Sequence, residues 1–140
     1  MIKTRWEHFP HEADIGIRGT GETLEQAFAQ TAMAMTAVIV EPARVAPLQA
    51  VEIRCDNPDR ALLLVDWLNA LIYEMDTRKM LFGKYRVILN GPKLIGTAWG
   101  ETVDVHRHHP AAQIKAATYT ELKVEQTPDH GWMAQCVVDV

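Results

Sequence analysis

The sequence predicts an α+β fold: a mixed, largely antiparallel sheet with two helices packed on it, in a single compact domain of residues 1–140. Two segments show the apolar spacing of helices, and six others are enriched in β-branched or aromatic residues. No linker, low-complexity tract or internal repeat divides the chain. With 48% hydrophobic residues, the chain should bury one sizeable core, as domains of about 150 residues bury roughly 70% of their unfolded surface.

The first helix is predicted over residues 23–40. Its apolar stripe recurs at helical spacing and consists of Leu24, Ala27, Phe28, Thr31, Met35 and Val38. Thr23 and Gln26 form the pattern of a capping box, in which the two side chains satisfy main-chain N–H groups at the helix start.

The second helix has the stronger pattern. Its stripe consists of Ala61, Leu64, Val65, Leu68, Leu71, Ile72 and Met75, and Asn57 and Pro58 suit the N-cap and first helical positions. Leu62, Leu63 and Trp67 add apolar surface outside this stripe. We therefore expect a central helix that contacts more than one neighbour.

Strands are predicted at residues 13–18, 48–55, 85–89, 93–99, 113–123 and 132–140. The pair Asn90-Gly91 is typical of a tight hairpin turn, although Pro92 leaves the turn type open. Residues 128–131 indicate a second hairpin, between the last two strands.

Charge and composition narrow the classes of partner. The chain has 14 Lys and Arg against 18 Asp and Glu, a net charge of −4, and no basic run. Autonomous nucleic-acid binding is therefore not expected, whereas a protein or cation partner suits an acidic surface. Without a secretory signal or an apolar stretch of membrane-spanning length, we expect a cytoplasmic protein with no membrane association.

The chain has two cysteines, Cys55 and Cys136, and we expect both to be small buried hydrophobic residues.

Carboxylates are the first candidates for a binding site. Alternation along residues 13–18 turns Asp14 away from the face that carries Ile15 and Ile17, although a single Asp also suits a turn. At the other end of the sequence, Asp139 is next to the terminal carboxylate of Val140. Neighbouring oxygen anions favour calcium, magnesium or manganese, but a solvated chain end explains them equally well.

Further charged residues follow the later strands. Glu101 and Asp104 lie just after the predicted strand 93–99, and Lys115 alternates away from apolar Ile114. Lys115 is suited to neutralising a carboxylate cluster, and solvent exposure is the alternative for a lone strand lysine.

The histidines raise the alternative of a zinc site. His106, His108 and His109 lie close together, and His8 and His11 are three residues apart. Zinc requires ligands on rigid elements, whereas this cluster falls in a connection before Pro110, where exposed histidines are common. No P-loop, no Gly-x-Gly-x-x-Gly pattern and no nucleophile elbow is present, so nucleotide binding has no support.

Six motifs together resemble the archease family, in its order and spacing and over nearly the whole chain. They are residues 9–17 (FPHEADIGI), 23–28 (TLEQAF), 64–69 (LVDWLN), 100–104 (GETVD), 114–118 (IKAAT) and 139–140 (DV). The resemblance implies an accessory protein, not an enzyme, that partners an RtcB-type RNA ligase in tRNA splicing and tRNA processing. In that role it promotes guanylylation of the ligase histidine and permits multiple turnover.

The resemblance also implies a divalent-metal site. Its ligands would be Asp14, Asp139 and the carboxylate of Val140, with Lys115 close by. We expect His11, Glu101 and Asp104 to be accessory to this site.

The sequence departs from the family pattern at two places. Glu12 stands where a small Thr is usual, which adds a candidate oxygen ligand, and His108-His109 replaces a His-Glu pair. Two other functions stay open at this point. One is an independent metal-dependent hydrolase that uses Asp14, Asp139 and nearby histidines, and the other is a scaffold or chaperone-like protein for RNA-processing enzymes.

Overall fold

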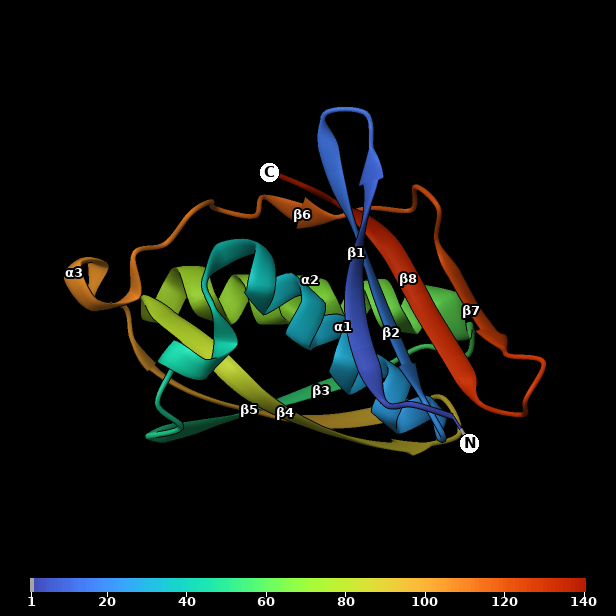
Figure 1. Ribbon diagram of the computed structural model, residues 1–140. Helices are drawn as coiled ribbons and strands as arrows, with labels where there is room; N and C mark the ends of the chain where they lie inside the picture. The colour runs from blue at the N-terminus through green and yellow to red at the C-terminus, as the bar shows by residue number, and fades with distance from the viewer. Residues whose placement is uncertain (1) are drawn as a thin grey trace.

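The computed structural model describes residues 2–140 and consists of two antiparallel sheets with two long helices (Figure 1). In chain order the elements are β1 (Arg5–His11), β2 (Asp14–Gly21), α1 (Leu24–Ile39), a 3-10 turn (Pro42–Arg44), β3 (Gln49–Asp56), α2 (Arg60–Arg78), β4 (Met80–Asn90), β5 (Lys93–Thr102), α3 (Val105–His108), β6 (Ala116–Ala117), β7 (Lys123–Gln126) and β8 (Trp132–Asp139). The α+β class predicted from the sequence is confirmed.

The strands divide between two sheets. The larger sheet has the order β1-β2-β8-β6, with β7 also paired to β8, and the smaller has the order β3-β5-β4. Figure 1 shows α1 and α2 between the two sheets, and each helix contacts strands of both. This arrangement explains the apolar surface outside the main stripe of α2, because a helix between two sheets buries side chains on two sides.

The Thr23 half of the predicted capping box of α1 forms, whereas Gln26 reaches the N–H of Glu22 and not that of the cap residue Thr23. The Thr23 hydroxyl accepts a hydrogen bond from the Gln26 N–H at 3.1 Å, and the Gln26 side-chain oxygen accepts from the Glu22 N–H at 2.8 Å. The helix itself covers Leu24–Ile39, so the predicted range 23–40 is confirmed to within one residue at each end.

The N-cap of α2 is Asp59, and the prediction of Asn57 was wrong. The Asp59 carboxylate accepts hydrogen bonds from the N–H groups of Ala61 and Leu62, at 2.9 and 3.1 Å. Asn57 instead accepts from the Asp59 N–H at 3.0 Å, so its side chain shapes the turn before the helix.

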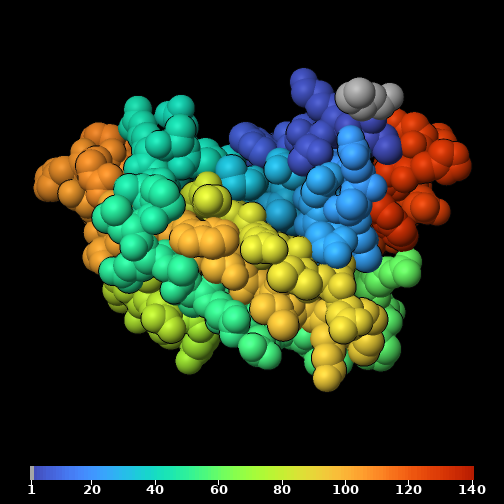
Figure 2. Space-filling model, turned by 90° about the horizontal axis from the view of Figure 1, so that it is seen from below, coloured from blue at the N-terminus to red at the C-terminus, as the bar shows by residue number. Residues whose placement is uncertain are grey.

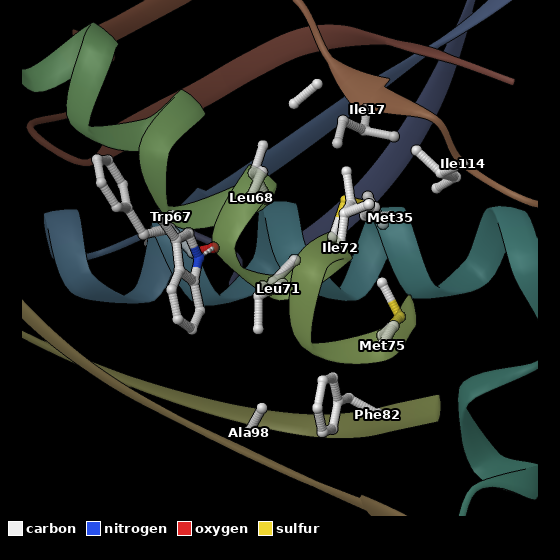
Figure 3. Close-up of a cluster of buried hydrophobic side chains, with 14 of the residues drawn as sticks. Ile17, Met35, Trp67, Leu68, Leu71, Ile72, Met75, Phe82, Ala98 and Ile114 are labelled. Carbon is white, nitrogen blue, oxygen red and sulfur yellow. Dashed lines mark hydrogen bonds between the residues drawn. The ribbon is translucent and has the colours of Figure 1, made fainter. Parts of the chain in front are cut away.

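One contiguous set of buried residues links both sheets through α2. In Figure 3, Leu68, Leu71 and Ile72 of α2 lie between Ile17 on the side of the larger sheet and Phe82 on the side of the smaller sheet. Trp67 is fully buried, and its indole N–H donates to the Phe28 carbonyl at 3.2 Å. A single core of this kind requires both helices and both sheets to pack together.

The predicted strand over 113–123 was largely wrong. Only β6 and the first residue of β7 are strand within it. On one side, the Asn69 side chain accepts from the Ala117 N–H at 2.9 Å and donates to its carbonyl at 3.3 Å. The amide thus takes the place of a neighbouring strand on the side of β6 that faces away from β8, and β6 pairs with β8 over two residues only.

The other strands follow the predictions more closely, and both expected hairpins form. Asn90 pairs with Lys93 across the two-residue turn, with Gly91 at φ +59°, and β7 pairs with β8 around residues 128–131. The polar strand β1 was not predicted; it is a sheet edge, where Pro10 is tolerated.

No helix in the described part of the chain combines the length and hydropathy needed to cross a bilayer.

Candidate carboxylate site

Strand pairing brings Asp14 and Asp139 to the same end of the larger sheet. The pairing of β2 with β8 runs in register to Ile15 opposite Val138, and the two aspartates are the next residue in each strand. Residues in register share a face of a sheet. Because Val138 is fully buried, the half-buried aspartates are on the face that points away from α1.

The adjacent tip belongs to the β1–β2 hairpin, which projects beyond the rest of the sheet in Figure 1. His11 pairs with Asp14, which puts this half-buried histidine on the carboxylate face. Glu12 and Ala13 form the exposed two-residue turn between them, and Glu12 has a positive φ of 53°. Positive φ is uncommon for a residue other than glycine and marks local backbone strain.

Lys115 joins this end of the sheet through its main chain. Its N–H donates to the Asp139 carbonyl at 2.8 Å, immediately before Ala116 pairs with Asp139. Val140 follows Asp139 beside the β1–β2 hairpin (Figure 1). Within residues 2–140, no ion pair involves Asp14, Asp139 or Lys115. The structure therefore brings five of the predicted site residues to this end of the sheet, namely Asp14, Asp139, Lys115, Val140 and His11. Within the described residues, the charges of the two aspartates and the lysine are unpaired.

The donor chemistry at this end suits a hard cation. Asp14 and Asp139 offer oxygen ligands, which calcium, magnesium and manganese prefer. Among residues 2–140, no group of three or more His, Cys, Asp or Glu side chains is close enough to hold a metal. A cation here would therefore need ligands beyond these side chains, such as main-chain oxygen at Val140 or groups of a partner.

Glu101 is not part of this carboxylate site, contrary to the expectation from the sequence. It is buried near the end of β5, where both its oxygens accept hydrogen bonds from the Arg107 guanidinium, at 2.9 and 2.5 Å. The Ala46 N–H and the His108 ring also approach it, at 2.6 and 3.0 Å. In Figure 1 this cluster beside α3 is far from the hairpin tip.

Asp104 belongs to the same remote cluster. It is the N-cap of α3 and accepts from the N–H groups of His106 and Arg107, at 3.1 and 3.3 Å. Asp104 therefore caps a helix, and the expectation that it is accessory to the site of Asp14 and Asp139 is wrong.

The environment of Glu101 shifts two pKa values. The Arg107 guanidinium, followed by the Ala46 amide and His108, holds the pKa of Glu101 well below its ordinary value. The carboxylate in turn raises the pKa of Arg107. Glu101 therefore stays ionised at neutral pH and acts as the centre of a structural cluster.

The histidine cluster splits in the structure. His108 is buried; its Nδ1 accepts from the Asp104 N–H at 2.8 Å, so its hydrogen is on Nε2 and points to Glu101. Both ring nitrogens of His108 are thus used inside the protein. His106 is exposed and His109 ends α3 at φ 49°, so the three rings do not form a ligand set.

Sequence reasoning missed Arg107 and Ala46 as partners of Glu101. Arg107 lies in a short exposed segment without periodicity, and the Ala46 N–H is a main-chain group with no sequence signal. The N-cap role of Asp104 was readable, since Asp is a preferred residue just before a helix.

Comparison with known families settles the relationship of the chain. The family model described as "Archease protein family (MTH1598/TM1083)" matches residues 6–140. The chain belongs to the archease family.

Two archease proteins illustrate the similarity. Protein archease of Thermococcus gammatolerans is 39% identical over 140 residues, covering 97% of this chain and 99% of that one. Protein archease of Pyrococcus furiosus has the same identity and coverage.

Solved structures agree with the fold of this archease family member. The solution structure of Methanobacterium thermoautotrophicum protein 1598 superposes with a TM-score of 0.85 at 29% identity, over 96% of this chain and 98% of that one. The crystal structure of a Thermotoga maritima archease, at 20% identity and a TM-score of 0.60, supports the fold alone.

Proposed function

We propose that this protein is an accessory factor, not an enzyme, that activates an RtcB-type tRNA-splicing RNA ligase. It would do so in the cytoplasm by promoting guanylylation of the ligase and multiple turnover. Membership of the archease family supports this proposal at the level of the family. The observation that supports it in this chain is the β2–β8 register, which runs to Ile15 opposite Val138 and so brings the next residues, Asp14 and Asp139, to the same end of the sheet beside an exposed tip.

The proposed working part is the set Asp14, Asp139, Lys115 and Val140. Two carboxylates on one face of neighbouring strands repel each other unless positive charge lies between them. Asp14 and Asp139 would hold a divalent cation, with the carboxylate of Val140 as the predicted third ligand. Bound there, calcium, magnesium or manganese would supply positive charge and open coordination sites.

Lys115 is the positioning residue of this set. Its main-chain hydrogen bond to Asp139 fixes the end of β8 next to β6. Its ammonium group would provide a second source of positive charge for the carboxylates. The protein would thus present a charged, partly neutralised tip to the ligase.

Side-chain contacts behind the tip support the position of the hairpin. The Phe9 ring lies over Gly16, where a Cβ atom would clash with it, and the Arg18 guanidinium lies 4.7 Å from the ring centroid. Arg18 also bonds Glu7 at 3.0 Å and Gln135 at 2.9 Å. These contacts join β1, β2 and β8 below the carboxylates.

The test is ligation of a tRNA-half substrate by the cognate ligase at limiting enzyme concentration. We would compare no addition, the wild-type protein and the variant Asp139→Asn. Asp76→Asn is the matched control, because Asp76 is an exposed aspartate on α2. We expect stimulation by wild type and control and a loss of at least about tenfold in the variant, the scale expected when groups coordinating a metal are disturbed.

The other outcomes separate the alternatives. Equal stimulation by all three proteins would support the activator role but reject the carboxylate mechanism. No stimulation by folded wild-type protein would reject the activator. In that case, cation-dependent hydrolysis of the RNA substrate by this protein alone would favour the hydrolase. If no hydrolysis is detected, the scaffold would be favoured.

A further inference from the structure

The smaller sheet has an outward face that the function proposed above does not use. Helices cover one side of β3, β5 and β4, and the other side is open to solvent; Figure 2 views the molecule from this side. Strand register puts Ala50, Trp99 and Lys84 in one row across the sheet, followed by Glu52, Thr97 and Arg86, then Arg54, Ile95 and Ile88, then Asp56, Lys93 and Asn90. We call these twelve residues the open sheet face.

Positive charge gathers on the open sheet face although the chain as a whole is acidic. The face carries four cations and two carboxylates, whereas the whole chain has 14 Lys and Arg against 18 Asp and Glu. Arg54 is paired with Glu52 at 3.0 Å. Within residues 2–140, Lys84, Arg86 and Lys93 have no carboxylate partner. Three exposed cations are therefore free to bind an anion.

The spacing of these cations follows from the strand. Lys84 and Arg86 are two residues apart on β4, so they point to the same side about 7 Å from one another along the strand. Neighbouring phosphates of an extended nucleic-acid strand are separated by a similar distance. The sheet thus arranges its cations in a row, although the sequence contains no basic run.

An apolar platform lies between the cations. Trp99 is half-buried in the middle strand, and the Lys84 ammonium lies 4.9 Å from the centroid of its ring. Ile95 and the exposed Ile88 add apolar surface further along the sheet, beyond the row of Glu52, Thr97 and Arg86. At its far end, a shallow cavity of about 260 Å³ is lined by Arg54, Cys55, Asp56, Lys93, Leu94 and Ile95.

We propose that the open sheet face binds single-stranded RNA, with Lys84, Arg86 and Lys93 contacting phosphates and Trp99 stacking on a base. Antiparallel sheets with exposed aromatic residues recognise unpaired bases in this way, and flanking cations follow the backbone. An acidic protein partner could bind through ion pairs with the cations alone. The Trp99 indole and the two isoleucines add an apolar surface on which a nucleic-acid base can stack.

The inference goes beyond the activator role and can fail separately from it, because its test contains no ligase. The probe is a fluorescein-labelled oligouridylate, titrated with the protein while fluorescence anisotropy is recorded. For three phosphate contacts, the logarithm of the binding constant should fall with the logarithm of salt concentration with a slope of about −2.

Two variants test the two halves of the proposal. Lys84→Glu with Arg86→Glu should weaken binding by about tenfold or more, because phosphate contacts become repulsive. The control Lys3→Glu with Lys123→Glu changes net charge equally at exposed positions on or beside the larger sheet, and should weaken binding by less than about threefold. Trp99→Leu keeps every charge and should weaken binding by about fivefold or more.

Circular dichroism would first show that each variant is folded. No binding by wild-type protein, or equal losses in the β4 variant and its charge control, would overturn the proposal. Unchanged binding by Trp99→Leu, together with equally tight binding of polyglutamate, would also overturn it, and would assign the face to an acidic protein surface instead.

Discussion

The Nε2 atom of His108 lies 3.0 Å from Oε2 of Glu101, and the same carboxylate receives two hydrogen bonds from Arg107. Glu101 is therefore a buried anion satisfied by two side chains and the Ala46 N–H. Removal of the Glu101 carboxylate would leave Arg107, His108 and the Ala46 N–H without this hydrogen-bond partner.

We expect Glu101 to make stability depend on pH. Its folded-state pKa is below the ordinary value of 4.5, so its contribution is fully present above about pH 4.5 and is lost as the pH falls toward the folded value. Urea unfolding should show Glu101→Gln to be less stable than wild type at pH 7, with a smaller difference near pH 3. Glu52→Gln, an exposed control paired with Arg54, should show little difference at either pH. A constant gap for Glu101→Gln would contradict this account.

Gly96 and Trp67 should be energetically coupled. A Cβ atom at position 96 would clash with the fully buried Trp67 ring, so Gly96→Ala should destabilise by about 1–3 kcal/mol. In a Trp67→Leu background the ring is gone, and the same change should cost less than half as much. A double-mutant cycle of unfolding free energies measures this coupling, and additive effects would show that the clash is relieved elsewhere.

The helix cap identified by the structure gives a third prediction. Asp59→Ala removes the acceptor for two N–H groups at the start of α2 and should destabilise by about 1 kcal/mol. Asp56→Ala, an exposed aspartate on β3, is the control and should be near neutral. Thermal unfolding of both variants provides the measurement, and equal losses would argue against the cap.

A cation bound by the proposed site should stabilise the folded state. Calcium at about one hundred times its dissociation constant would add about 2.7 kcal/mol, seen as a rise in melting temperature that EDTA reverses. Asp14→Asn should abolish the rise, whereas Asp76→Asn should retain it. The same comparison with magnesium and manganese would rank the ions, and an equal rise in both variants would place the cation elsewhere.

Both cysteines should react slowly in the folded protein. Burial raises the pKa of Cys136 to about 12, and burial together with nearby Asp66 raises that of half-buried Cys55 to about 11. Since the thiolate is the reactive form, neither should react quickly with iodoacetamide at neutral pH. Cys136 should be modified only after unfolding, which mass spectrometry would detect, and prompt labelling in the folded protein would disprove its burial.

Local patterns in the sequence were enough to predict much of the fold. The apolar stripe and capping box located α1 to within a residue at each end, and Asn90-Gly91 located a hairpin. The same patterns failed where side chains from distant segments replace backbone partners, as Asn69 does beside Ala117. A hydrogen bond between residues so far apart leaves no periodic signal.

The sequence by itself determined the fold class, the two helices, the family and the chemical type of the candidate ligands. Only the tertiary structure decided which of those ligands meet. Pairing of β2 with β8 brings Asp14 and Asp139 to the same end of the larger sheet, whereas Glu101 bonds Arg107 and Asp104 caps α3. Sheet register and burial fix these neighbours because they depend on contacts between distant segments, and a linear pattern specifies residue types but not which segments pack together.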